Sequence, residues 1–284
     1  KNFVSCWQFR RCVPCDNRTR TERRIVSLTI PTPGIRRRSV TGLWLRHAVS
    51  FVRYWKFIIT WVLIEPVIIL VAVGFGVGKL IDEIDGAPSY AEFVTPGLIM
   101  GNAMFHALFE TSWNAYNRID NDVYETALTT PITITEITMG DILWAVTRSI
   151  MTVVGTATVA ALFGWLNHWE AIGIIIPAIM VGITFGALGF LFSAVAPHTT
   201  FLTLVFTLVA SPMFFFSGSF FPISILPDWV EPIAWFMPLT SAVHIARGFA
   251  LGSLDITHLW AGLYMILLTA VIWPAAIFLL RRRL

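Results

Sequence analysis

An apolar stretch that prolines repeatedly interrupt, residues 211–252, constrains the fold of this chain more than any other feature. It starts with three consecutive phenylalanines and then contains Gly218, Pro222, Pro227, Pro232 and Pro238. Proline removes a backbone donor and clashes with the preceding turn, so each proline ends or kinks a helix. In hydrocarbon, the freed backbone groups must be covered by protein or face water. We therefore predict a membrane helix that breaks into short apolar pieces lying at a membrane surface. An ordinary long loop between spans is the alternative.

The composition indicates an all-α integral membrane protein. Of the 284 residues, 56% are hydrophobic and only 13% are charged, against about 25% charged in soluble proteins. The mean hydropathy is +0.72, and the length allows about six spans. The three cysteines all lie in the N-terminal arm, so the fold does not depend on a disulfide bond.

The N-terminal arm, residues 1–39, differs in charge from the rest of the chain. It carries a net charge of +8, whereas residues 40–284 carry −5. The arm is either a basic disordered tail held near an anionic membrane surface or sequence that is not native coding sequence; we favour the second interpretation. We assign the transmembrane domain to residues 40–284. Within it, a basic, tryptophan-bearing helix at 43–56 is expected to lie in the membrane interface, or else to extend the first span into the cytosol.

Six apolar segments predict six transmembrane helices, at residues 57–77, 93–113, 142–166, 171–195, 201–216 and 259–280. Arginines and lysines precede the first segment and follow the last one, which predicts that both termini are cytoplasmic. The segment 116–139 then faces the cytosol, and the broken segment 217–257 faces outward.

Sequence motifs for catalysis are missing. The glycine-rich residues 74–79 fail as a phosphate-binding loop, because Val73 stands at the required first glycine and Leu80 at the Ser/Thr position. The sequence contains no H-E-x-x-H or G-x-S-x-G motif, and its six histidines are scattered. We therefore expect no enzyme activity, no metal and no cofactor in this chain.

Ionisable residues at or near the predicted spans are costly there, namely Glu65, His106, Glu110, Asp141 and Arg148. Asp141 and Arg148 are seven residues apart, on one face of the third span. We expect Arg148 to pair with Glu110 or with Glu65, either pinning spans together or lining a cavity open to the cytosol. A proton-coupled secondary transporter would use such residues as relays, so that class of protein stays open as an alternative.

The cytosolic segment 117–138 combines a weak apolar stripe with a polar side. Ile119, Val123 and Leu128 form the stripe, and Asp122 and Glu125 lie on the polar side. A short amphipathic helix of this kind is typical of a docking surface for a partner, although a solvated face without a partner has the same pattern.

Two separated sets of residues resemble one family of membrane proteins. The cytosolic set covers 110–111, 117–118, 124–131 and 140–145, and the second set covers 212–222, 226–227, 237–240, 247 and 251–252. In both sets the chain is similar to the permease subunit of ABC-2 type exporters, in particular the NodJ-like branch associated with lipo-oligosaccharide export. The resemblance extends over residues 40–284.

This resemblance implies a homodimer with six spans in each half, a cytosolic coupling helix between spans two and three, and short re-entrant outer helices between spans five and six. Two separate ABC ATPase subunits, which bind the ATP and magnesium, dock on the coupling helices. On this basis we assign the ATPase contact to Arg118, Asp122, Tyr124, Glu125 and Pro131. We assign the substrate pathway or outer gate to Phe214, Phe215, Phe216, Phe220 and Phe221.

The function implied is export of an amphiphile across the bacterial inner membrane, with no nucleic-acid partner. The amphiphile could be a lipid-linked glycan, a lipo-oligosaccharide, a lipid or a drug, and the sequence does not choose among them. Two rival interpretations remain: the proton-coupled secondary transporter, and a membrane anchor that transports nothing.

Overall fold

The computed structural model describes residues 37–54, 56, 64–78, 87–166 and 168–284. The predictions made for the basic arm and its cysteines, for the start of the first span and for the loop at 79–86 lie outside these residues, as does the side chain of Glu65. Residues 35–284 form one compact unit, and the following description concerns that unit.

All elements of the described residues are helical. The first half contains α2 (Arg37–Arg53), α4 (Glu65–Val71), the π-helical η2 (Ala72–Val77), α5 (Tyr90–Asp120), α6 (Val123–Leu128) and α7 (Ile134–Leu162). The second half contains η3 (Trp169–Ile174), α8 (Ile175–Val195), α9 (Thr199–Val205), η4 (Phe206–Ala210), α10 (Ser211–Phe214), η5 (Phe215–Ser219), η6 (Ile223–Ile225), α11 (Glu231–Phe236), α12 (Pro238–Leu251) and α13 (Ile256–Arg283).

Four helical runs are long and apolar enough to cross a membrane: Ile134–Leu162, Trp169–Val195, Thr199–Ser219 and Ile256–Arg283. A shorter apolar helix covers Val67–Val77. The 31-residue α5 is also long enough, but Asn102, His106 and Glu110 interrupt its apolar sequence. The all-helical, multi-span fold class is confirmed, and the count of six spans stays a prediction.

Helix α8 forms the centre of the bundle and packs against α5, α7 and α13. Small residues let these helices approach closely, as is usual in membranes. A Cβ atom on Gly182 would come within 2.7 Å of the Val146 Cα in α7, and one on Gly189 within 2.9 Å of the Leu108 carbonyl oxygen in α5. The apolar core around α8 includes Met104 and Phe185, both fully buried.

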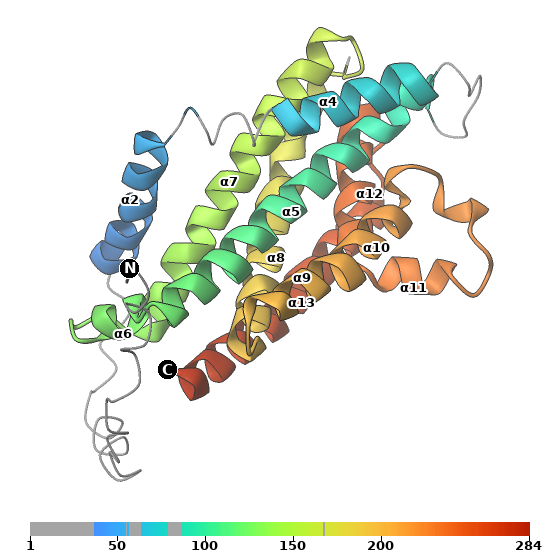
Figure 1. The fold of residues 1–284 in the computed structure, drawn as a ribbon. Helices are drawn as coiled ribbons and strands as arrows, with labels where there is room; N and C mark the ends of the chain where they lie inside the picture. The colour runs from blue at the N-terminus through green and yellow to red at the C-terminus, as the bar shows by residue number, and fades with distance from the viewer. Residues whose placement is uncertain (1–36, 55, 57–63, 79–86, 167) are drawn as a thin grey trace, which may run out of the picture. The chain divides into compact units, whose positions relative to one another are not determined.

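Two further apolar clusters mark the two ends of the bundle. At one end, Leu43 of α2, Tyr124 of α6 and Leu280 of α13 belong to a single cluster, so α6 lies at the same end as the C-terminus (Figure 1). At the other end, Leu70 of α4 and Tyr90 at the start of α5 belong to another cluster. Figure 1 shows α4 and α6 at opposite ends of α5.

The interrupted stretch 211–252 continues the helix that starts at Thr199, and this helix ends where Gly218 takes a left-handed conformation with φ of 76°. The helices η6, α11 and α12 follow. One face of α12 is buried against α5, α13 and η3, so this piece packs into the bundle, and the position of these pieces at a membrane surface stays a prediction. That face is rich in small residues, including Ala242, Ala246 and Gly248, which allow the close approach.

The backbone groups freed by this break find partners from side chains. Arg247 of α12 donates to the carbonyl oxygens of Gly218 (2.8 Å) and Phe93 (3.3 Å), and its guanidinium lies 3.8 Å from the centre of the Phe93 ring. Thr240 donates to the Ala234 carbonyl oxygen at 2.6 Å, and Tyr264 of α13 to that of Phe236. The break is therefore compatible with hydrocarbon surroundings, because its polar groups are paired inside the protein.

Helix α7 starts earlier than the span predicted at 142–166. Its N-terminus is a capping box, in which the Thr133 hydroxyl accepts from the Glu136 amide and the Glu136 carboxylate accepts from the Thr133 amide. A capping box can start a helix in a polar stretch. A prediction based on hydropathy places the start later, where the apolar sequence begins.

We expect Gly182→Ala to destabilise the protein. The added methyl group meets the backbone of Val146, so α7 and α8 must separate, at a cost of about 1–3 kcal/mol. The control is Gly42→Ala in α2, where nothing lies within 4 Å of the new atom and helix propensity improves. Thermal unfolding in detergent measures both variants; a Gly182→Ala protein as stable as the control would contradict this packing.

Candidate functional site

A buried carboxylate, Asp141, collects hydrogen bonds from three other helices. It lies in the second turn of α7 and is completely buried. One of its oxygens, Oδ1, lies 2.5 Å from His47 Nε2 of α2. The other, Oδ2, accepts from Arg118 Nη1 of α5 at 2.9 Å and from the Tyr124 hydroxyl of α6. Asp141 therefore joins α2, α5 and α6 to α7.

Arg118 extends this arrangement to a second carboxylate. Its Nη2 donates to Glu110 Oε1 at 3.0 Å, two helical turns back along α5, and lies 3.4 Å from His47 Nδ1. Glu110 is itself buried, and Arg118 is mostly so. We call these five residues, His47, Glu110, Arg118, Tyr124 and Asp141, the Asp141 cluster. Its two carboxylates face one guanidinium, so the ionised groups are paired as burial requires.

The local sequence explains how α6 comes to face this cluster. Helix α5 runs to Asp120, and Asp122 then takes a left-handed conformation with φ of 56°, which aspartate tolerates better than most residues. The chain turns there, and α6 buries Tyr124 while Glu125 stays exposed. Ile119, predicted to share a helix with Val123, instead belongs to α5.

Burial raises the pKa of the Tyr124 phenol well above its ordinary value, and the charge of Asp141 adds to the shift. The hydroxyl therefore stays protonated and donates to Asp141. Because Tyr124 is the one member of the Asp141 cluster that α6 contributes, this hydrogen bond is the polar link from α6 to the spans.

A cavity of about 530 Å³ lies beside the Asp141 cluster, between α2, α5 and α7. His47, Glu110 and Arg118 line it, together with Arg46 and Arg148. Aromatic side chains complete the lining, namely Phe51, Tyr54, Phe109 and Trp144. The cavity thus combines positive charge with aromatic surface.

The five residues predicted to contact an ATPase differ in exposure. Asp122, Glu125 and Pro131 are exposed, whereas Arg118 and Tyr124 point into the Asp141 cluster. A partner could therefore touch only the exposed three directly.

The charged residues predicted inside the spans pair differently from the expectation. Glu110 forms its ion pair with Arg118. Arg148 instead lies 5.8 Å from the centre of the Phe51 ring, and its Nε is buried without a hydrogen-bond partner among the described residues. The side chain of Glu65, the other expected partner, lies outside those residues.

The phenylalanines assigned to a pathway or outer gate do not form one surface. Phe214 packs inward against Phe105 of α5 and against Phe220, whereas Phe215 and Phe216 are 51% and 40% exposed. Phe220 stacks on Phe215, and Phe221 is partly buried.

Sequence reasoning did not place His47 or Asp141 in a site, although Asp141 lies in a motif that carries the family resemblance. The signal available for Asp141 was an acid at the edge of an apolar segment, which needs a partner. Its main partner, Arg118, was also visible in the sequence, but His47 is 94 residues away and gave no signal. Within the described ranges, no group of three or more His, Cys, Asp or Glu is arranged to hold a metal ion.

The fold and this site define a multi-pass helical membrane protein in which a short helix at one end is tied to several spans through a buried ion-pair cluster. Residues 38–251 match the sequence profile of the ABC-2 type transporters. The chain belongs to the ABC-2 type transporter family. It is thus a non-catalytic transmembrane subunit, of a family whose permeases pair with an ABC ATPase.

Similar proteins support this assignment over most of the chain. Nodulation protein J of Rhizobium leguminosarum bv. viciae is 33% identical over 226 residues, which cover 79% of this chain and 85% of the relative. Nodulation protein J of Rhizobium meliloti is 30% identical, over 75% of this chain and 81% of the relative. The inner membrane transport permease YadH of Escherichia coli is 21% identical, over 77% of this chain and 84% of the relative.

We expect Asp141→Asn to destabilise the protein strongly. The substitution keeps the size of the side chain but removes the charge that faces Arg118, and breaking a buried pair costs about 3–5 kcal/mol. Glu125→Gln removes one negative charge from the exposed side of α6 and should change stability by no more than about 0.5 kcal/mol. Thermal unfolding in detergent compares the two; equal effects would show that the Asp141 cluster does not hold the helices together.

Proposed function

We propose that this chain is the membrane-spanning half of an ATP-driven exporter of the bacterial inner membrane, which moves an amphiphilic substrate outward. Two copies form a homodimer of twelve spans on the six-span topology expected above, and two ABC ATPase subunits dock on it. Family membership supports the pairing with an ATPase. The name of one relative, an inner membrane transport permease, supports the location.

The position of α6 supports a cytosolic docking surface. The apolar cluster that contains Tyr124 of α6 also contains Leu280 of α13. Leu280 is followed by the three arginines that end this helix, Arg281, Arg282 and Arg283. Positively charged residues flanking a span favour the cytosolic side, which supports a cytosolic position for both α6 and the C-terminus. The N-terminus lies on the same side if the number of spans is six.

The observation that carries the proposal is the two-sided character of α6. Its exposed side, with Asp122 and Glu125, faces away from the bundle and is open to an ATPase. Its buried side holds Tyr124 against Asp141 of α7, and Asp141 in turn holds Arg118 of α5. A displacement imposed on the exposed side by ATPase closure therefore reaches α5 and α7 together.

The proposed mechanism is alternating access. Movement of α6 tilts the spans tied to the Asp141 cluster, and the nucleotide shifts the equilibrium because the ATPase dimer binds the two arrangements unequally. The cavity beside the Asp141 cluster receives the substrate on the cytosolic side. Its arginines suit an anionic head group and its aromatic rings suit sugars or acyl chains.

The substrate class we propose is an amphiphile with a polar head and an apolar tail, such as a lipid-linked glycan, a lipo-oligosaccharide, a lipid or a drug. On the outer side, the pair Phe215 and Phe220 forms part of the exit or its gate. Their ring stacking beside Gly218, where the helix breaks, supports a movable closure.

The decisive experiment reconstitutes the chain with its ATPase in proteoliposomes. We expect transport that requires ATP and stops when the phosphate-binding lysine of the ATPase is replaced. Transport that persists with a proton gradient alone would instead establish the secondary transporter with Glu65, Glu110 and Arg148 as relays. Binding of the ATPase without any transported or ATPase-stimulating lipid, glycan or drug would favour the membrane anchor.

The buried side of α6 is tested by Tyr124→Phe, which removes the hydroxyl but keeps the ring. We expect normal binding of the ATPase but substrate-stimulated ATP hydrolysis reduced about tenfold, because losing about 1.4 kcal/mol of coupling energy corresponds to that factor. Tyr116→Phe is the matched control: it removes a tyrosine hydroxyl that bonds the Pro197 carbonyl oxygen, away from α6. Equal activities of the two variants would rule out transmission through Tyr124.

The exposed side of α6 is tested by Asp122→Asn together with Glu125→Lys. Asparagine also accepts the left-handed conformation at position 122, so the turn is kept while the charge is changed. We expect weaker capture of the ATPase in detergent, with a stronger salt dependence, and an unchanged thermal stability of the isolated chain. Unchanged capture would place the docking surface elsewhere.

A further inference from the structure

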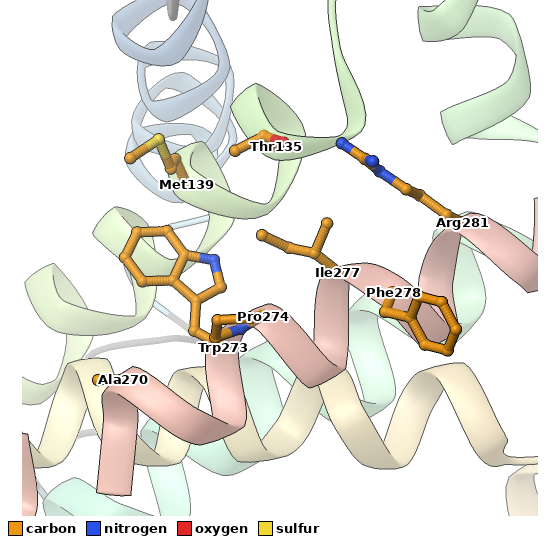
Figure 2. Close-up of a pocket in the computed structure, with 8 residues that line it drawn as sticks. All are labelled: Thr135, Met139, Ala270, Trp273, Pro274, Ile277, Phe278 and Arg281. Atoms are coloured by element: carbon orange, nitrogen blue, oxygen red, sulfur yellow. The ribbon is translucent and has the colours of Figure 1, made fainter. Parts of the chain in front are cut away.

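A second cavity, of about 450 Å³, lies between the first turns of α7 and the C-terminal half of α13. Figure 2 shows Met139, Trp273 and Ile277 around it, with Arg281 and Thr135 at the end nearest the C-terminus. Its size falls within the range of small-molecule sites, about 300–1,000 Å³. It is separate from the Asp141 cluster, none of whose residues lines it.

The cavity belongs to the side of the bundle that α13 presents outward. Along that helix, Ile266, Val271 and Phe278 are 60%, 70% and 53% exposed. In a membrane-spanning chain such a face meets hydrocarbon, so the molecules that reach this cavity come from the bilayer. An acyl chain fits its apolar lining.

The charge at one end of the cavity comes from a single arginine. Of the three arginines that end α13, Arg282 lies over the Phe278 ring at 4.3 Å and Arg283 donates to the Ser193 carbonyl oxygen. Arg281 has no such contact among the described residues, and Figure 2 shows it extending toward Thr135. A free guanidinium at the end of a span is placed to bind the phosphate of a lipid head group.

Trp273 also lines the cavity. The Trp273 Nε1 atom is buried and has no hydrogen-bond partner among the described residues. Figure 2 shows its ring nitrogen turned toward Ile277, on the side where Arg281 lies. The part of the indole ring that borders the cavity therefore offers apolar surface to an acyl chain.

We propose that this cavity binds one anionic phospholipid from the membrane leaflet at the end of the bundle that carries α6. One acyl chain fills the apolar space beside Met139, Trp273 and Ile277, and the phosphate pairs with Arg281. The bound lipid bridges α7 and α13 near the end of the bundle that carries α6. This site is independent of the substrate cavity and of the proposed export function.

Native mass spectrometry of the full chain tests the proposal, with titration of phosphatidylglycerol or phosphatidylcholine into the detergent. We expect one phosphatidylglycerol to bind about tenfold more tightly than phosphatidylcholine, since one charge-assisted pair contributes about a tenfold factor. Arg281→Gln should remove this preference. Arg282→Gln, the same change one residue further along and away from the cavity, should keep it.

The indole is tested in the same assay by Trp273→Phe, with Trp260→Phe at the far end of α13 as the control. Weaker binding of both lipids in Trp273→Phe alone supports the proposal. If Arg281→Gln and Arg282→Gln lost the preference for phosphatidylglycerol equally, the proposal would be overturned, because the preference would then reflect general attraction between the basic C-terminus and anionic lipid. So would loss of a dimer peak in Arg281→Gln with lipid binding unchanged, which would assign the cavity to a second copy of the chain.

Discussion

The arrangement of the end of the bundle that carries α6 depends on one buried carboxylate. Asp141 is fully buried, and three donors from three helices meet on its two oxygens. Burying this charge is favourable only while its partners stay in place, so the helices that supply them have little freedom to shift independently. Separation of α6 from α7 would leave a phenol and a carboxylate without their shared hydrogen bond.

The same requirement shapes the segment around Gly218, where it applies to the backbone rather than to charges. Where the helix breaks at the buried Gly218, Arg247 donates to the Gly218 carbonyl oxygen, and the same guanidinium donates to the Phe93 carbonyl oxygen of α5. Proline-broken segments and buried arginines therefore belong together in this fold. The first creates unpaired acceptors, and the second supplies several donors from one side chain.

The sequence predicted the helical class and most of the long spans, because sustained hydropathy over twenty residues has few other interpretations. It also predicted a short helix after α5, from a pattern of apolar and polar residues. It did not predict which acid pairs with which arginine. Arg118 and Arg148 both lie near Glu110, and the choice depends on side-chain reach and on the position of α2, neither of which spacing encodes. The burial of α12 was missed for a related reason: prolines and glycines indicate a break but not where the chain goes after it.

The two turns that flank α6 have a consequence for timing. On one side the chain bends at Asp122, the one non-glycine residue with positive φ in the described part, and on the other it enters α7 through the Thr133–Glu136 box. Local hydrogen bonds fix both turns, so the short segment between them cannot extend to absorb a movement of α6. We therefore expect a rotation of α6 to displace α5 and α7 at the same time rather than one after the other.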